Sequence, residues 1–143
     1  MTNDPARNRR WFGFSPLAML GWFSGCLKTE PELAFERELN GRPLMDDETF
    51  FRSHYGSTCL PREIPIRLRR LFADQLGAPW ARVQPSDKPA EVYLDLDFAE
   101  LVADAQAEFG LSISTDEMRE LDGSFDSLVR CVADKLVPRP PHS

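Results

Sequence analysis

The chain has 143 residues, a formal net charge of −6 and a pI of about 4.9, with 42% apolar and 28% charged residues. These proportions exclude a wholly disordered chain. The acidic balance, without a basic stripe carrying aromatic side chains, argues against nucleic-acid binding. Three cysteines, Cys26, Cys59 and Cys131, match no zinc site or paired disulfide framework. We therefore expect no metal and a reducing, cytoplasmic compartment.

Residues 1–60 are interpreted as an N-terminal extension, with an apolar segment at 11–26 followed by short helices. Glycine and proline interrupt the apolar segment, which is too short to cross a bilayer, so no membrane association is expected. We interpret it as an anchor that packs on the domain or on another protein. The alternative is an exported lipoprotein, because Arg9 and Arg10 precede the segment and Cys26 ends a weak cleavage box.

Two short helices are expected in this extension, one over 31–40 and one from Asp46 to just before Gly56. Acidic residues open the second of these helices, where they suit the helix dipole.

A longer helix is predicted over 65–76. Pro65 stands in the first turn, apolar residues recur at helical spacing, and Gly77 provides the stop. Three arginines interleave with the apolar residues, and we expect them to form the exposed face of the helix. A lesser alternative is that they bind an anionic lipid or substrate. The arginines are Arg67, Arg69 and Arg70.

After a loop over 78–90, in which Trp80 and Val83 are expected to point inward, the strongest helix is predicted over 97–109. Asp97 and Glu100 have the spacing of a capping box. A short turn of helix near 115–121 and a last helix over 124–136 follow. The proline-rich tail, 137–143, is expected to be disordered. The predicted core consists of Leu68, Leu71, Phe72, Leu76, Phe98, Leu101, Val102, Phe109, Ile113, Leu128 and Val132.

The order of these elements resembles the acyl carrier protein fold. Residues 66–77, which close with Gln-Leu-Gly, look like the first helix of that family, and residues 100–113 look like its second, recognition helix. The same stretches are similar to an uncharacterised bacterial family of carrier-protein-like domains. The resemblance implies an all-α, acyl-carrier-protein-like helical bundle over 61–136.

The sequence departs from that family at one decisive position. In true carriers an Asp-Ser-Leu triplet opens the recognition helix, and the serine bears the phosphopantetheine. Here the triplet is Leu94-Asp95-Leu96, and a carboxylate cannot replace the alcohol. We therefore expect no cofactor. A literal Asp-Ser-Leu at 126–128 leaves too little chain after it for the rest of the fold. A genuine carrier modified at an atypical residue remains the alternative.

The acidic residues are concentrated in one part of the chain. Ten lie between Glu91 and Asp122, against Arg119 alone. We predict a non-catalytic module that docks a protein partner with a basic surface. A solvated helix face is the simpler alternative. No enzyme is expected, because no nucleophile–base pair is suggested. The predicted contact residues, at the start or outer side of the 97–109 helix, are Asp95, Asp97, Glu100, Asp104 and Glu108.

Asp95 allows two interpretations of its own. An acidic residue at a helix N-terminus stabilises the helix by about 0.3–1 kcal/mol and needs no function. Alternatively, it keeps a negative charge where the phosphate ester would be in a carrier, so that a partner built for carriers still binds.

Overall fold

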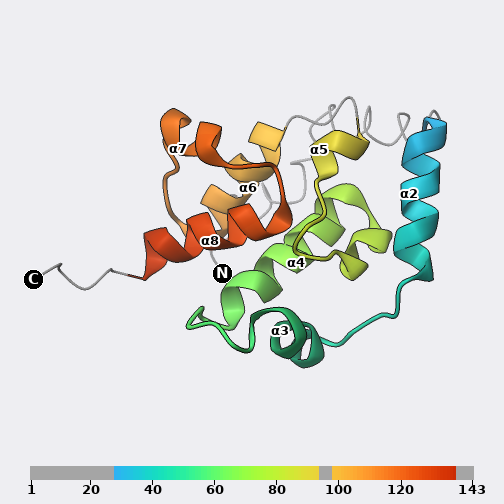
Figure 1. Ribbon diagram of the computed structural model, residues 1–143. Helices are drawn as coiled ribbons and strands as arrows, with labels where there is room; N and C mark the ends of the chain where they lie inside the picture. The colour runs from blue at the N-terminus through green and yellow to red at the C-terminus, as the bar shows by residue number, and fades with distance from the viewer. Residues whose placement is uncertain (1–27, 94–97, 138–143) are drawn as a thin grey trace, which may run out of the picture.

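The computed structural model describes residues 28–93 and 98–137. Within these ranges the chain forms helices and no strand, which confirms the all-α prediction (Figure 1). The apolar segment 11–26, Asp95, Asp97 and the end of the tail lie outside the described residues. The elements are α2 (Glu30–Gly41), α3 (Asp47–Tyr55), α4 (Glu63–Leu76), the 3-10 helix η2 (Ala78–Arg82), α5 (Pro89–Val92), α6 (Phe98–Phe109), α7 (Thr115–Glu120) and α8 (Phe125–Leu136).

The helix boundaries follow local signals that the sequence shows. Gly77 has a φ of 111° and its N–H donates to the Ala73 carbonyl over 3.0 Å, so α4 ends where the glycine was expected to end it. The Ser124 hydroxyl accepts from the N–H of Ser127 over 3.1 Å and caps the start of α8. The three predicted long helices are therefore confirmed. Helices α4 and α8 begin within two residues of their expected starts, and α6 is described from Phe98 onward.

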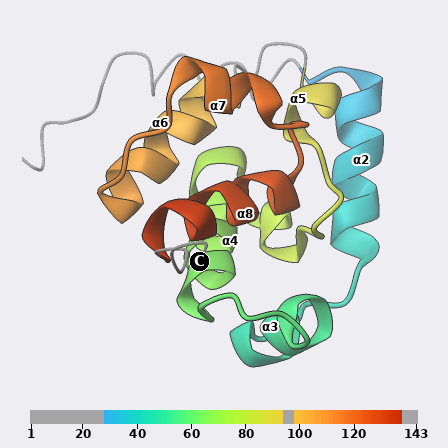
Figure 2. The same cartoon turned by 60° about the vertical axis from the view of Figure 1, so that its left-hand side comes forward.

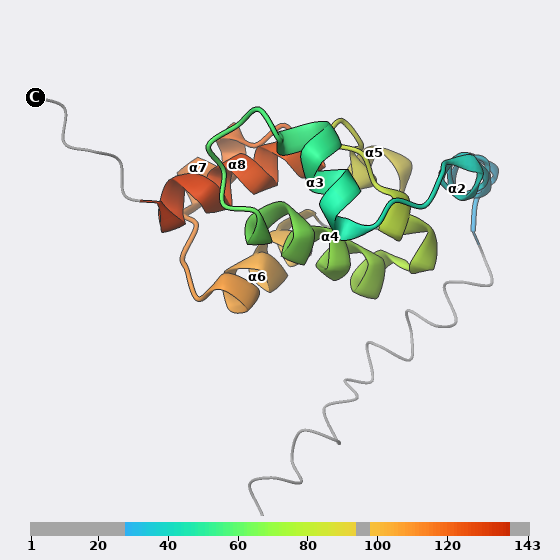
Figure 3. The ribbon, with the colours of Figure 1, turned by 90° about the horizontal axis from the view of Figure 1, so that it is seen from below.

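Helix α4 is the centre of the arrangement, because it contacts α3, α6, α8 and η2. Helix α2 contacts η2 and α5 instead. Seen from below, α2 is at one end of the molecule and α6 to α8 are at the other, with α4 between them (Figure 3). The turned view shows α8 crossing in front of α4 (Figure 2). No described helix is long and apolar enough to cross a membrane.

One hydrophobic core joins these helices. All eleven predicted core residues belong to it or lie half-buried against it, and Trp80 and Val83 point inward as expected. The core also takes in Leu39, Phe50 and Tyr55 from α2 and α3. The part of 1–60 that the structure describes therefore packs on the same core as the later helices. The division at residues 60 and 61 stays a prediction.

The expected exposed arginine face of α4 is wrong at one position. Arg70 is exposed and Arg67 half-buried, but Arg69 is only 5% exposed. Its Nε donates to the Ala81 carbonyl over 2.8 Å, its Nη2 donates to the Met45 carbonyl, and its guanidinium lies 4.7 Å from the centre of the Phe50 ring. Residues of η2 and of the segment before α3 cover this side of α4, which helical periodicity alone cannot show.

Candidate functional site

Helix α6 carries the three predicted contact residues that the structure describes. Glu100 and Glu108 are exposed and Asp104 is half-buried, while Leu101 and Ala105 are buried in the core. Because residues four apart lie next to one another along a helix, the three carboxylates follow one side of α6. We call these three residues, Glu100, Asp104 and Glu108, the acidic face of α6.

Glu108 differs from the other two because an arginine of α4 already neutralises it. The Arg67 Nε lies 2.9 Å from Glu108 Oε1, and Arg67 Nη2 donates to the Glu108 carbonyl over 2.6 Å. The same guanidinium lies 4.3 Å from the centre of the Phe109 ring. Glu108 therefore helps to join α6 to α4.

Glu100 and Asp104 have no ion pair or side-chain hydrogen bond with any other described residue. Burial raises the pKa of Asp104 above its ordinary value, and no basic group opposes this effect. Asp104 therefore loses hydration without gaining a cation in return. Two negative charges on this face are left without a counterpart in the described part of the chain.

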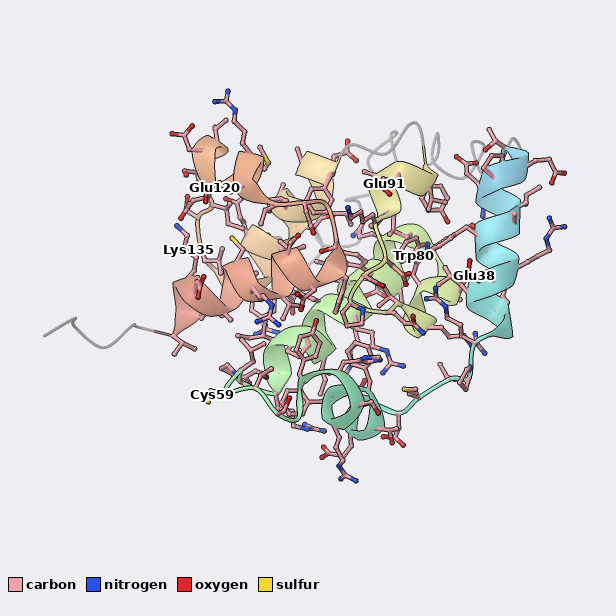
Figure 4. The ribbon with its side chains drawn as sticks, viewed as in Figure 1. Glu38, Cys59, Trp80, Glu91, Glu120 and Lys135 are labelled. Carbon is pink, nitrogen blue, oxygen red and sulfur yellow. The ribbon has the colours of Figure 1, made fainter. Side chains whose placement is uncertain are left out.

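The acidic residues of α7 and α8 are mostly neutralised by neighbours. Glu117 Oε1 lies 2.6 Å from Lys135 Nζ, and this bond, together with the Ser114 N–H, lowers the pKa of Glu117 to about 2. Asp126 pairs with Arg130 at 2.8 Å. Figure 4 labels Lys135 on α8 and Glu120 on α7, on the same side of the molecule. Lack of a partner is therefore not general among the acidic residues.

The alternative attachment serine, Ser127, is engaged inside α8. Its hydroxyl donates to the Ser124 carbonyl over 2.8 Å, in the first turn of the helix.

Among the described cysteines, Cys59 is exposed and Cys131 half-buried, and burial raises the pKa of the Cys131 thiol. No group of three or more His, Cys, Asp or Glu residues within 28–93 and 98–137 could hold a metal ion.

A second polar region was missed by the sequence interpretation. Arg42 holds Asp87, which is 7% exposed, through two bonds of 2.6 and 3.1 Å. Asp87 also accepts from the Gln84 N–H over 2.7 Å, and its carbonyl accepts from the Phe125 N–H over 3.0 Å. The pair therefore joins the end of α2, the turn after η2 and the start of α8. Because its members are 45 residues apart, no local pattern reveals it.

Comparison with known proteins found no relative of this chain. No protein-family model matches the chain, and no curated protein or solved structure is similar to it at a significant level.

Proposed function

We propose that the chain is a non-catalytic, acyl-carrier-protein-like module that docks a basic protein partner through the acidic face of α6. The observation that carries the proposal is the unbalanced charge of Glu100 and Asp104, beside acidic residues that have partners of their own. A solvated face would not need a half-buried carboxylate without a cation. A lysine or arginine from a partner would provide one, with a charge-assisted hydrogen bond.

The shape of α6 also suits a close approach. Ala103 and Ala107 are exposed on the helix, between the carboxylates in the sequence. Small side chains allow a partner to come near the helix backbone, so that a long basic side chain can reach Asp104 beside them. Glu108 is placed at the edge of this docking surface, because Arg67 already holds it.

The order of α4, a long connection, α6, a short α7 and α8 supports the carrier-like part of the proposal. Asp95 takes the position of the attachment serine, so the module carries no prosthetic arm and no acyl group. In this proposal, the module keeps the docking function of a carrier without its cargo. We place this function in the cytoplasm.

Affinity capture with matched variants tests the proposal. The double reversal Glu100→Lys with Asp104→Lys should lose a partner that the wild-type chain retains, because like charges then meet at the interface. The control is Glu63→Lys with Asp74→Lys, two exposed acids of α4 with the same change of charge and no ion pair in the described part. A protein kept by wild type and control but lost by the reversal supports the proposal. A partner kept equally by all three places the interface elsewhere.

The carrier-like register has a test of its own. Incubation with a phosphopantetheinyl transferase and coenzyme A should leave the mass of the wild-type chain unchanged, because Asp95 offers no hydroxyl. The variant Asp95→Ser should gain one phosphopantetheine, as measured by intact-mass spectrometry. An adduct on the wild-type chain would refute the loss of carrier chemistry. No adduct on Asp95→Ser would remove the support for the proposed register.

A further inference from the structure

A small cavity between α3, η2 and the segment before α3 has an unusual lining. Its volume is about 30 Å³. Its lining includes three arginines and a histidine, Arg42, Arg69, Arg82 and His54, but no carboxylate. Figure 4 shows side-chain nitrogens gathered between α3 and the lower end of α2, below Trp80 and Glu38. Carboxylates outside the lining balance Arg42 and Arg69, which leaves the charge of Arg82 to be explained.

Arg82 differs from the other two arginines in its contacts. Its Nε is buried and has no hydrogen-bond partner, and the side chain forms no ion pair with any other described residue. Buried polar atoms are nearly always hydrogen-bonded, and a bound water or ion is one explanation for an exception. The residue as a whole is half-buried, so either a water or an anion could accept from the Nε, and only an anion would also pair with the guanidinium charge.

The other two arginines are held in place and still have donors to offer. A guanidinium has five N–H groups. The bonds of Arg69 to Ala81, Asp47 and Met45 use one N–H on each of its three nitrogens, so two remain. The bonds of Arg42 to Asp87, Glu38 and the Arg82 carbonyl involve only Nη1 and Nη2, so its Nε is free for another acceptor. Neither side chain would need to be reordered on binding.

His54 completes the lining and reports on its charge. Its ring packs edge-on against Phe50 at 5.1 Å, and burial together with the Arg69 charge lowers its pKa below the ordinary value. The ring is therefore uncharged at neutral pH, and the positive charge of the lining comes from the arginines. An anion in the cavity would oppose the effect of Arg69 and alter the signals of the ring.

We propose that this cavity binds a compact oxyanion, a carboxylate or phosphate group, with Arg82 as its main ligand and Arg42 and Arg69 as supporting donors. Guanidinium groups match both kinds of oxyanion in geometry and charge. The cavity is larger than the roughly 10–15 Å³ that one water requires. The site is separate from the acidic face of α6, so either proposal can fail without the other.

A nuclear magnetic resonance titration of the full chain tests the site directly. Inorganic phosphate and acetate are added separately, at neutral pH and constant ionic strength, while the side-chain signals of both histidines are followed. The His54 signals should shift and saturate, whereas those of His142, the second histidine of the sequence, should not. The anion that saturates at the lower concentration identifies the preferred oxyanion.

Arg82→Gln should weaken this binding by about tenfold or more, the effect of losing a charge-assisted hydrogen bond. Because the Arg82 side chain has no bond to lose, the amide spectrum should otherwise stay that of the wild type. Arg119→Gln, at an exposed arginine of α7, is the control and should bind as the wild type does. Absence of a saturable His54 shift in the wild type, or an equal shift in Arg82→Gln, would overturn the proposal. If Arg82→Gln fails to fold, the wild-type titration alone decides.

Discussion

Two charged regions of the molecule differ in how their charges are balanced. Around α4 and η2, Arg42 and Arg69 are held by carboxylates and backbone carbonyls at several points each. On the acidic face of α6, Glu108 has an arginine, but Glu100 and Asp104 have no partner in the described part of the chain. Arg42 and Arg69 therefore stabilise the fold, while Glu100 and Asp104 leave charge available for another molecule.

The difference shows why the number of charges is a poor guide to function. Both regions are dense in charge, but a guanidinium with acceptors on several elements acts as a structural link. A carboxylate that is half-buried without a cation lowers stability instead. The partners of each charged group, more than the number of charges, distinguish the structural contacts of Arg42 and Arg69 from the docking surface.

The largest expected effect is the loss of stability when a ring in the centre of the shared core is removed. Phe72 is fully buried and its ring lies 5.1 Å from that of Phe125 and 6.1 Å from that of Trp80. Phe72→Ala should lower the free energy of unfolding by about 3–5 kcal/mol, measured by urea denaturation. Phe109→Ala is the control, and its loss should be smaller because Phe109 is only half-buried. Equal losses would show that the two rings are buried alike.

The next effect separates a buried pair from a surface pair. Asp87→Asn breaks the Arg42 pair in a site that is 7% exposed and should cost about 2–3 kcal/mol of unfolding free energy. Glu108→Gln breaks the Arg67 pair, which is about 40% exposed, and should cost less than about 1 kcal/mol. Urea denaturation of both variants under the same conditions makes the comparison. A larger loss in Glu108→Gln would reverse the structural roles assigned to the two regions.

The smallest effect is a pair of opposite pH dependences. The pKa of Asp104 is raised in the folded protein, so protonation of Asp104 stabilises the fold. This contribution to stability is fully present below pH 3.8, the ordinary pKa, and is lost as pH rises through the raised pKa. Asp104→Asn should therefore gain stability relative to wild type from acid to neutral pH. The pKa of Glu117 is lowered to about 2, so the ionised carboxylate stabilises the fold above pH 4.5. This contribution to stability is lost as pH falls towards 2.

Glu117→Gln should therefore lose stability at neutral pH, and the difference from wild type should shrink in acid. Denaturation midpoints measured from acid to neutral pH give both slopes. If Asp104→Asn instead loses stability relative to wild type as pH rises, Asp104 is paired with a cation in the folded protein.

The helices could be predicted because their signals are local. Pro65, Gly77 and the capping serine of α8 mark boundaries within a few residues, and the helical spacing of Leu68 and Phe72 marks a buried face. The inward orientation of Trp80 and Val83 follows from the sequence because large apolar side chains in a loop gain most by burial.

The polar sites could be predicted only in part. The carboxylates of α6 lie on one helix, so their shared side follows from spacing. The burial of Arg69 does not follow from the sequence, because the carbonyls that hold it, at Met45 and Ala81, come from elements distant in the sequence. The pairs Arg42 with Asp87 and Arg67 with Glu108 depend on tertiary packing in the same way, over 45 and 41 residues.

Docking through the acidic face of α6 is tested by the affinity for the captured partner, measured across a salt series with three proteins. Wild-type binding should weaken steeply as salt rises, because screening reduces attraction between exposed charges. The double variant Glu100→Gln with Asp104→Asn should bind more weakly and respond less to salt, while Glu108→Gln should stay close to wild type. Affinity that is indifferent both to salt and to the double substitution would contradict docking through the acidic face of α6.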